Sequence, residues 1–350
     1  MRIVMTDLRT FRDRTVNVLV VKLSSLGDVI HATGALRAIR RALPRARIAL
    51  AVESRWRDVV CQNPNVDLVI ESSSQQRLSF SYLREIRHSL AAHGPHDVAI
   101  DLQGNRRSAA WIYLSRADVM VGRGGFRPGW KRAVQPDLTR HAVTVCADIC
   151  RSVGVGIDDP SPEIHTNPRD EQGVERSLAE VGLPSRGFVV LNPFSRWTSK
   201  SWPLDSAAEV IRRLRTATPL PVVLSGGLED RDQAAALQAI LGPGAVPSLV
   251  GRLSLGMALC LFRRGRLMVS CDSGPMHAAA AFGVPTVALF GPTHAERTGP
   301  WGPHHRVIQA SRPPTHHSYR SDPGCSYMRL LDPDVILAAI IAELSTGDSP

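Results

Sequence analysis

Residues 269–293 hold the pattern with the clearest chemical meaning in this chain of 350 residues. A short apolar run leads into a polar break at 272–274, and Pro275 then opens an Ala-rich segment that ends at Gly283. Pro favours the first turn of a helix, and Gly favours the position after the last turn. A helix that begins directly after a strand presents N–H groups that suit a phosphate. An ordinary βαβ crossover has the same local pattern, so both interpretations stay open.

The lysines form a second informative set, because the chain uses arginine almost everywhere else. Of its 42 basic residues, three are lysines: Lys22, Lys131 and Lys200. Lysine supplies a compact point charge rather than a planar fork, so each one is a candidate contact to a phosphate or a carboxylate. The alternative is that three lysines remain by chance in a chain with a general bias towards arginine.

Composition narrows the class of protein. With 43% hydrophobic and 21% charged residues, the chain can bury two sizeable cores. The net charge of +10 favours polyanionic partners such as nucleic acid, an anionic membrane surface or phosphorylated small molecules. No nucleic-acid recognition motif accompanies the charge, so nucleic acid is not an expected partner.

Several other classes lack their signatures. The charged N-terminal 15 residues have no apolar core, so no signal peptide is expected, and no apolar run is long enough to span a membrane. The six cysteines form no C-x-x-C pair, which predicts buried, reduced thiols in the cytoplasm rather than disulfides or a zinc site. Motifs for metalloproteases, P-loop enzymes and simple dehydrogenases are missing.

Alternating elements must position these residues. In the first half, apolar runs predict strands at 16–22, 47–52, 66–70, 97–102 and 118–122. Helical spacing predicts the segments between and after them: 30–43, 55–61, 81–92, 107–115 and 141–153. This alternation is typical of a parallel sheet covered by helices on both faces. The basic stretch 123–140 is expected to be an irregular loop of functional importance.

The pattern restarts after a linker at 154–168, rich in Gly, Pro and Asp. Predicted strands follow at 187–192, 220–225, 246–250, 267–271 and 285–290. Predicted helices lie at 170–181, 203–216, 230–241, 254–265, 275–282 and 332–345. The expected domains are 1–160 and 161–350, and packing of the C-terminal helix back onto the first domain is left open. Ligands of such sheets bind beyond the carboxyl ends of the strands, which predicts a crevice between the two halves.

Three blocks then resemble a known family. Residues 20–31, 192–203 and 272–302 are similar to the N-terminal, donor-site and most specific C-terminal blocks of glycosyltransferase family 9, the lipopolysaccharide heptosyltransferases. The resemblance covers about residues 16 to 345. It implies an α/β fold of the GT-B type, with two Rossmann-like doubly wound domains facing across a cleft. It also implies an ADP-heptose donor, an acceptor in the phosphorylated inner core of lipopolysaccharide, and no metal or other cofactor.

The resemblance assigns the catalytic roles. Asp28 matches the family's general base, which deprotonates the acceptor hydroxyl. Ser25 and Asp28 also have the spacing of a capping box, and one residue can serve both purposes. Lys200 matches the residue that contacts the donor phosphates and stabilises the departing ADP; its alternative is a solvated loop lysine.

The remaining assignments are binding residues. On the donor side, the resemblance and the strand ends together indicate nine residues: Asn192, Ser195, Thr198, Lys200, Glu229, Asp272, Ser273, Gly274 and His277. Asp272 is expected on the sugar, whereas His277 has a packed core residue as its alternative and Glu229 a solvated helix cap. On the acceptor side, the candidates are Lys22, Ser24, Ser25, Gly27, Arg106, Arg107, Arg127, Lys131 and Arg132. Any of these arginines has a solvated surface charge as its alternative.

The function predicted from the resemblance is transfer of heptose, with inversion, from ADP-L-glycero-D-manno-heptose to a lipopolysaccharide inner core. The enzyme is expected in the cytoplasm, with peripheral attachment to the inner leaflet of the inner membrane as an option. Segments 75–90 and 123–140 match nothing that fixes one acceptor. Two alternatives remain: a GT-B enzyme with another nucleotide sugar or a protein or natural-product acceptor, and a non-catalytic protein that binds nucleotides or polyanions.

Overall fold

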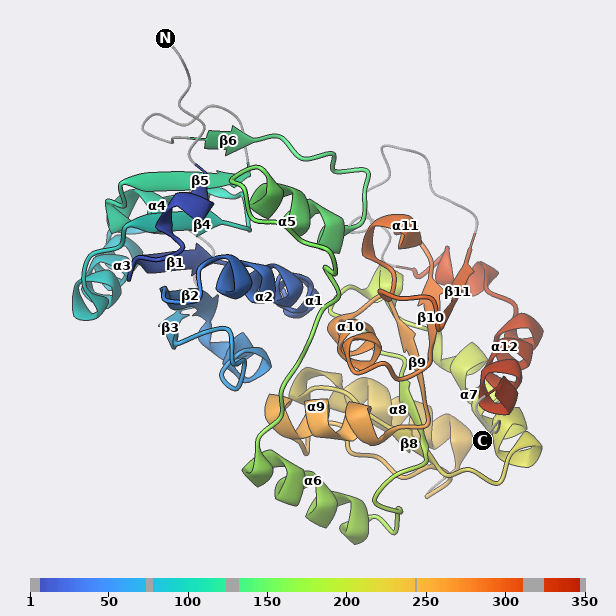
Figure 1. The fold of residues 1–350 in the computed structure, drawn as a ribbon. Coiled ribbons are helices and arrows are strands. Elements are labelled where there is room, and N and C mark those ends of the chain that lie inside the picture. The colour runs from blue at the N-terminus through green and yellow to red at the C-terminus, as the bar shows by residue number, and fades with distance from the viewer. Residues whose placement is uncertain (1–6, 74–77, 124–131, 243, 311–323, 347–350) are drawn as a thin grey trace. The chain divides into compact units, whose positions relative to one another are not determined.

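The computed structural model describes residues 7–73, 78–123, 132–242, 244–310 and 324–346 (Figure 1). The chain divides into two compact units, residues 1–165 and 166–350. Each unit is an α/β structure around one parallel sheet, and the helices pack in layers on both sides of it. The alternation of apolar runs with helical segments thus predicts the fold class correctly.

The first unit contains a six-stranded sheet in the order β3-β2-β1-β4-β5-β6. Its strands are β1 (Asn17–Val21), β2 (Arg47–Glu53), β3 (Leu68–Ser72), β4 (Val98–Asp101), β5 (Val119–Arg123) and β6 (Arg132–Val134). Its helices are η1 (Leu8–Phe11), α1 (Leu26–His31), α2 (Thr33–Ala42), η2 (Ser54–Val59), α3 (Phe80–His93), α4 (Arg106–Ser115) and α5 (Ala142–Arg151). Helices α3 and α4 pack together, and α2 packs with α5.

The second unit contains a five-stranded sheet in the order β11-β10-β9-β7-β8. Its strands are β7 (Val189–Asn192), β8 (Val222–Leu224), β9 (Leu267–Cys271), β10 (Thr286–Phe290) and β11 (His305–Gln309). Its helices are α6 (Pro168–Glu180), η3 (Thr198–Lys200), α7 (Leu204–Ala217), η4 (Leu228–Asp230), α8 (Arg231–Leu241), α9 (Leu255–Arg264), α10 (Gly274–Ala281), α11 (Ala295–Thr298), η6 (Met328–Leu330) and α12 (Pro333–Thr346). One layer contains α7, α8 and α12, and the other contains α6, α9 and α10.

Burial explains why these sequences become strands. Strand β1 follows the pattern of one half-buried residue and four buried ones, and β9 and β10 are buried throughout. A strand covered on both faces needs apolar residues at successive positions rather than alternate ones. The central strands of both sheets therefore come from the most continuous apolar runs of the sequence.

Two local predictions were wrong, and two strands were missed. Residues 246–250 form no strand; they contribute one isolated bridge between Leu224 and Ser248, because Pro247 has no N–H to donate to a ladder. The predicted helix 55–61 is the shorter 3-10 helix η2. Strand β11 and the short β6, which adds to the sheet at its edge, were not predicted.

The C-terminal helix belongs to the second unit and packs on that unit's own sheet. Helix α12 contacts α7 and strands β9, β10 and β11. Its side chains Ile336, Ile340 and Leu344 are buried in the same apolar cluster as Ile211 and Leu214 of α7. A helix with a mainly apolar composition has to cover an apolar surface, and the sheet of its own unit supplies that surface.

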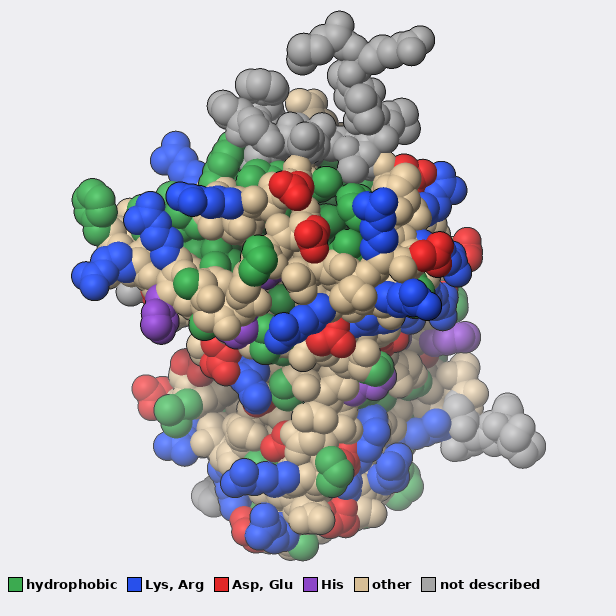
Figure 2. All heavy atoms as spheres, turned by 60° about the vertical axis from the view of Figure 1, so that its left-hand side comes forward, with side chains coloured by type: hydrophobic (Ala, Val, Ile, Leu, Met, Phe, Trp, Pro, Cys, Tyr) green, Lys and Arg blue, Asp and Glu red, His purple; other side chains and the backbone are tan. Residues whose placement is uncertain are grey.

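The last features of the fold are its surface charge, its cysteines and its lack of a long apolar helix among the described residues. In the view of Figure 2, Lys and Arg side chains are interspersed with acidic ones rather than gathered into one basic stripe. All six cysteines are free: four are buried, and Cys61 and Cys325 are half-buried. Across the described ranges, no helix has the length and apolar composition needed to cross a bilayer.

Candidate active site

In each sheet, the first strand of the unit has later strands on both sides, which creates a switch point. In the first unit, β1 lies between β2 and β4. In the second unit, β7 lies between β8 and β9. The connections leave these neighbouring strands in opposite directions, so the carboxyl ends of β1 and β4, and of β7 and β9, border a space suited to a ligand. Many of the predicted site residues lie at these two edges.

Lys22 crosses the switch point of the first sheet. It follows β1 directly, its side chain is 6% exposed, and its Nζ donates to the carbonyl of Leu102, just after β4, at 3.0 Å. The same Nζ lies 3.7 Å from Oδ1 of Asp28. A buried ammonium requires such partners, since burial of an isolated charge is costly. The lysine thus places a buried positive charge next to the Asp28 carboxylate.

The Asp28 carboxylate is held by hydrogen bonds and is still partly exposed. Its Oδ2 accepts hydrogen bonds from the backbone N–H of Ser25 at 2.9 Å and from the Ser25 hydroxyl at 2.8 Å. These are contacts of the capping box at the start of α1. Even so, the side chain is 43% exposed. Asp28 therefore caps its helix and still presents a carboxylate to solvent at the carboxyl edge of the sheet.

The other residues of this loop hold the backbone. The N–H of Ser24 donates to Oε1 of Gln103 at 3.1 Å, which ties the loop after β1 to the loop after β4. Ser25 is exposed and Gly27 is buried. The loop that carries Asp28 is thus held from the far side of the switch point.

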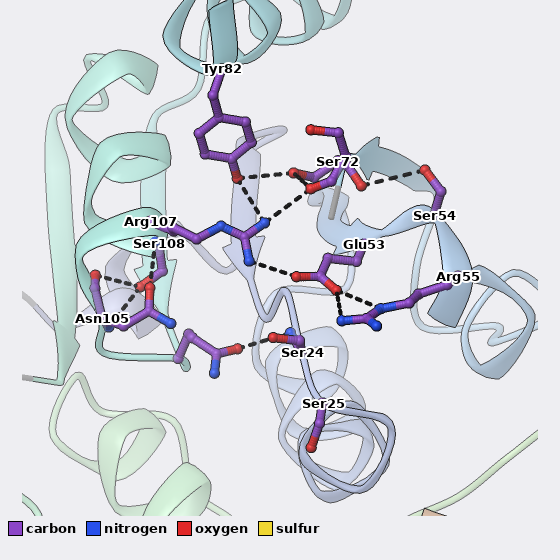
Figure 3. A network of polar contacts seen from close by, with 12 residues as sticks. Ser24, Ser25, Glu53, Ser54, Arg55, Ser72, Tyr82, Asn105, Arg107 and Ser108 are labelled. Atoms are coloured by element: carbon purple, nitrogen blue, oxygen red, sulfur yellow. Dashed lines mark hydrogen bonds and ion pairs between the residues drawn. The ribbon is translucent and has the colours of Figure 1, made fainter. Parts of the chain in front are cut away.

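The two predicted arginines of α4 differ in their surroundings. Arg106 is exposed and has no ion pair among the described residues. Arg107 is 12% exposed; its guanidinium contacts the Glu53 carboxylate at 2.6 Å, and also the Tyr82 hydroxyl and the Ser73 carbonyl (Figure 3). Although burial by itself opposes the charge, the bonds to Glu53 raise the pKa of Arg107. In this structure Arg107 organises the interior, and Arg106 is the one that faces solvent.

Three acceptor candidates cannot be placed. Arg127 and Lys131 lie outside the described residues. Arg132 belongs to β6, and its side chain is not described. Their assignment to the acceptor stays a prediction.

The switch point of the second sheet contains a largely buried ion pair, which we call the closed pair. Nζ of Lys200, at the end of η3, lies 2.7 Å from Oδ2 of Asp272, directly after β9. The Thr293 hydroxyl, in the loop after β10, donates to the same oxygen at 2.7 Å. The two charged side chains are 15% and 7% exposed. The structure thus brings together two donor candidates that lie 72 residues apart in the chain.

Helix α10 begins beside this pair. Ser273 is its N-cap residue, Gly274 and Pro275 are its first two residues, and the Ser273 hydroxyl makes no capping bond. That hydroxyl instead lies 3.1 Å from the hydroxyl of Ser270. The first turn of the helix has the partial positive charge that suits a phosphate. His277, the fourth residue of the helix, is buried, with 7% of its surface exposed.

The remaining donor candidates fall into two groups. Asn192 is buried, and its Nδ2 donates to the Ser225 carbonyl at 3.0 Å, which links the ends of β7 and β8. Ser195 exchanges hydrogen bonds with Ser201 and shapes the turn before η3. Thr198 and Glu229 are exposed. The first two residues support the site from within, and the last two face solvent.

Sequence reasoning missed two residues of these sites, Glu53 and Thr293. Glu53 ends the apolar run of β2, is 1% exposed and pairs with both Arg107 and Arg55. An acid that ends a buried strand was the available signal, because Asp101 and Asp272 occupy comparable positions. For Thr293, which lies far from Asp272 in sequence, no local pattern indicated the contact.

Cys271 lies on the buried side of the second site. The thiol, directly before Asp272, is fully buried and lies 3.1 Å from the Phe194 carbonyl. Burial raises its pKa to about 12, and the neighbouring Asp272 adds to the effect. The thiol therefore stays protonated and serves as core rather than as a nucleophile.

The two edges offer complementary chemistry. The first presents an exposed carboxylate that can accept a proton. The second combines an ammonium, a carboxylate and a helix start, which together suit a phosphorylated sugar. Among the described residues, no group of three His, Cys, Asp or Glu side chains is arranged to hold a metal ion.

Comparison with known proteins adds an independent finding. Residues 83–326 match the model of glycosyltransferase family 9 (heptosyltransferase). The chain is 30% identical over 300 residues to lipopolysaccharide heptosyltransferase 1 of Pseudomonas aeruginosa, covering 81% of each chain. Its structure is similar to that of a family 9 glycosyl transferase from Veillonella parvula, with a TM-score of 0.84, 25% identity and coverage of 95% and 98%.

A third similarity concerns a ligand complex. An E. coli heptosyltransferase solved with ADP-2-deoxy-2-fluoro heptose is similar in structure, with a TM-score of 0.69, 22% identity and coverage of 93% of this chain and 98% of that one. At this identity the likeness shows the fold. It supports the α/β fold class expected for the chain.

Proposed function

Because this chain belongs to glycosyltransferase family 9, we propose that it transfers a heptose from ADP-L-glycero-D-manno-heptose to the inner core of lipopolysaccharide. The chain is an enzyme of this family, and the donor and acceptor are the proposed parts. The P. aeruginosa relative is a lipopolysaccharide heptosyltransferase, and the E. coli protein binds an ADP-heptose analogue. Both support the choice of donor.

The observation that carries the proposal is the Asp28 carboxylate, exposed at the carboxyl edge of the sheet with Lys22 3.7 Å behind it. Asp28 accepts the proton of the acceptor hydroxyl while that oxygen forms a bond to the anomeric carbon of the heptose. The bond from this carbon to the β-phosphate oxygen breaks, and ADP leaves with the electron pair. Attack from the opposite face inverts the anomeric centre. A positioned base contributes about 10²–10⁴-fold to such a step.

The second unit is assigned to the leaving group. The diphosphate lies at the first turn of α10, against Ser273 and Gly274, and near His277. Lys200 has three N–H donors, so it can hold Asp272 and also contact the phosphate that takes up the charge. Lys200 and Thr293 both donate to Oδ2 of Asp272, and we assign Oδ1 to a hydroxyl of the heptose. Thr198 and Glu229 line the remainder of the donor site.

The acceptor assignments follow the same logic. Arg106 is exposed at the first turn of α4 and suits a phosphate or carboxylate of the inner core. Arg107 acts indirectly, because it is bound to Glu53. The acceptor is a glycolipid, so we place the enzyme in the cytoplasm, at the inner leaflet of the inner membrane. We further propose that transfer needs no metal, with Lys200 and the start of α10 supplying the positive charge.

The proposal is tested by measuring ADP release from ADP-heptose, with and without truncated lipopolysaccharide acceptors of graded length. We expect release only with an acceptor that carries the correct inner-core terminus. Release from another nucleotide sugar at a comparable rate would favour the other GT-B donor. Tight binding of ADP without turnover on any acceptor would favour the non-catalytic alternative.

A further inference from the structure

The first residue of α3 has an aromatic side chain that is almost fully exposed to solvent. Phe80, the first residue of the helix, is 89% exposed, more than any other large apolar side chain among the described residues. Leu78, two residues earlier, is 44% exposed. Single exposed apolar side chains are common on protein surfaces, so Phe80 is informative only together with the residues around it.

The same face of α3 is basic. Arg84 and His88 follow Phe80 at intervals of four residues, Arg87 lies beside them, and all are exposed. Neither arginine forms an ion pair among the described residues. The acid of this segment, Glu85, is occupied elsewhere, since it accepts the N–H of Ser73 at 2.7 Å. The exposed face therefore combines one apolar tip with two arginines that form no ion pair among the described residues.

The opposite side of the helix is anchored firmly. Tyr82 is fully buried, and its hydroxyl accepts from Nε1 of Trp111 at 3.1 Å and lies 3.0 Å from the Ser72 hydroxyl. The Arg107 guanidinium lies 5.2 Å from the centre of the Tyr82 ring and is itself held by Glu53 at the end of β2 (Figure 3). The start of α3 thus has a fixed position at the sheet edge that also carries Ser24, Ser25 and Asp28.

We propose that Phe80 and Leu78 insert into the interface of an anionic membrane, with Arg84 and Arg87 contacting lipid phosphates. An aromatic and a leucine beside basic side chains is a combination that binds at membrane surfaces. The apolar area is too small for the core of a stable protein interface, which needs several buried anchors. The inference rests on the proposed glycolipid acceptor, because the contact would hold the acceptor edge of the first unit against the membrane.

Flotation of the purified full-length protein with vesicles tests the proposal without using the reaction. We expect the wild type to float with vesicles of phosphatidylcholine and phosphatidylglycerol and to bind phosphatidylcholine vesicles weakly. Phe80→Ser should weaken binding about tenfold, from loss of ring burial. The double variant Arg84→Gln/Arg87→Gln should lose about fivefold per arginine, on anionic vesicles alone.

Matched controls lie in the second unit. Leu330→Ser removes an apolar side chain that is 59% exposed, and Arg169→Gln/Arg176→Gln removes two exposed arginines of α6. Both controls should float like the wild type. Each variant should keep its melting temperature and its ADP release with a delipidated core acceptor, which separates this proposal from the proposed function.

Three results would overturn the proposal. The first is wild-type flotation by Phe80→Ser, and the second is an equal loss in the controls. The third is self-association or capture of a protein through Phe80 by a wild type that does not float, which would make this face a protein interface. If no heptose transfer is found, the proposed function is wrong, and the flotation result alone decides the membrane proposal.

Discussion

The two lysine–aspartate pairs occupy corresponding edges of their sheets but differ in almost every physical respect. Lys22 and Asp28 are 3.7 Å apart, and the carboxylate is 43% exposed. Lys200 and Asp272 are 2.7 Å apart, and neither side chain is more than 15% exposed. The first pair is local, with both members in the segment after β1. The second joins the segments after β7 and β9, which lie 72 residues apart.

The difference teaches what each edge can do. A carboxylate with an exposed face can receive a proton from a substrate, whereas a closed pair holds its charges in place. A fixed, partly buried ammonium is the better partner for a charge that develops on a leaving group, because it needs no rearrangement during the reaction. Five experiments change or measure the difference in exposure and bonding between the two pairs.

Removing the open carboxylate should have the largest effect. Asp28→Asn keeps the shape and the contact to Ser25 but cannot accept the proton. We expect turnover to fall about 10²–10⁴-fold, measured as ADP release under saturating substrates, with ADP affinity unchanged in calorimetry. Asp118→Asn, exposed before β5 at the opposite edge, should behave like the wild type. Turnover near the wild-type rate in Asp28→Asn would exclude Asp28 as the base.

Opening the closed pair should affect stability as well as activity. Lys200→Met leaves Asp272 buried with one partner fewer, which should cost about 1–3 kcal/mol of unfolding free energy in denaturant titrations. Donor affinity and turnover should fall together. The double variant Lys200→Met/Asp272→Asn should regain most of the stability without regaining ADP binding. Wild-type donor affinity in Lys200→Met would refute its role at the phosphates.

Lys22→Met should have a smaller effect, because Asp28 keeps its two contacts to Ser25. The variant removes the buried charge behind the carboxylate and the donor to Leu102. We expect turnover to fall about tenfold, equivalent to about 1.4 kcal/mol of activation free energy. Lys22→Arg should not restore the rate, since a planar guanidinium does not fit the space of an ammonium. An unchanged rate in Lys22→Met would show that Asp28 works without this charge.

The exposure difference can be measured directly in the unmodified protein. A water-soluble carbodiimide with an amine nucleophile should modify Asp28 well before Asp272, because Asp272 is 7% exposed and bound to Lys200 and Thr293. Peptide mass spectrometry over time reads both sites in one sample. Equal rates at the two residues would mean that the contrast between the pairs does not exist in solution.

Metal removal should have the smallest effect. If Lys200 and the start of α10 supply the positive charge at the diphosphate, dialysis against EDTA should leave the rate of ADP release unchanged. A loss of rate that Mg²⁺ restores would assign part of that role to a metal ion and reduce the weight of the closed pair.

The fold was largely predictable because its signals are local. Apolar runs such as 187–192 and 267–271 fell close to the observed strands, since a strand covered on both faces must be apolar throughout. Errors arose where another constraint took over. Pro247 prevented a ladder at 246–250, and β11 is an edge strand whose residues are partly exposed, so its apolar signal is weak.

The site residues also divide into those that a local sequence pattern indicates and those that only the tertiary structure brings together. Ser25 and Asp28 could be read as a capping box because they lie three residues apart, and the structure contains that box. Arg107 was expected at the acceptor, but no pattern in the sequence pairs it with Glu53, which lies 54 residues away. The exposed start of α3 was likewise not anticipated, because exposure depends on what the rest of the chain covers.

The sequence alone determined most of the elements, the order in which they alternate, and the capping contact between Ser25 and Asp28 within one turn. Local sterics and the burial of continuous apolar runs decide those features without reference to distant residues. The tertiary structure decided which edges meet: Lys200 reaches Asp272 and Arg107 reaches Glu53 only because parallel strands align their carboxyl ends in one register. That alignment follows from packing helices on both faces of a sheet, and it turns separate charged residues into one open and one closed pair.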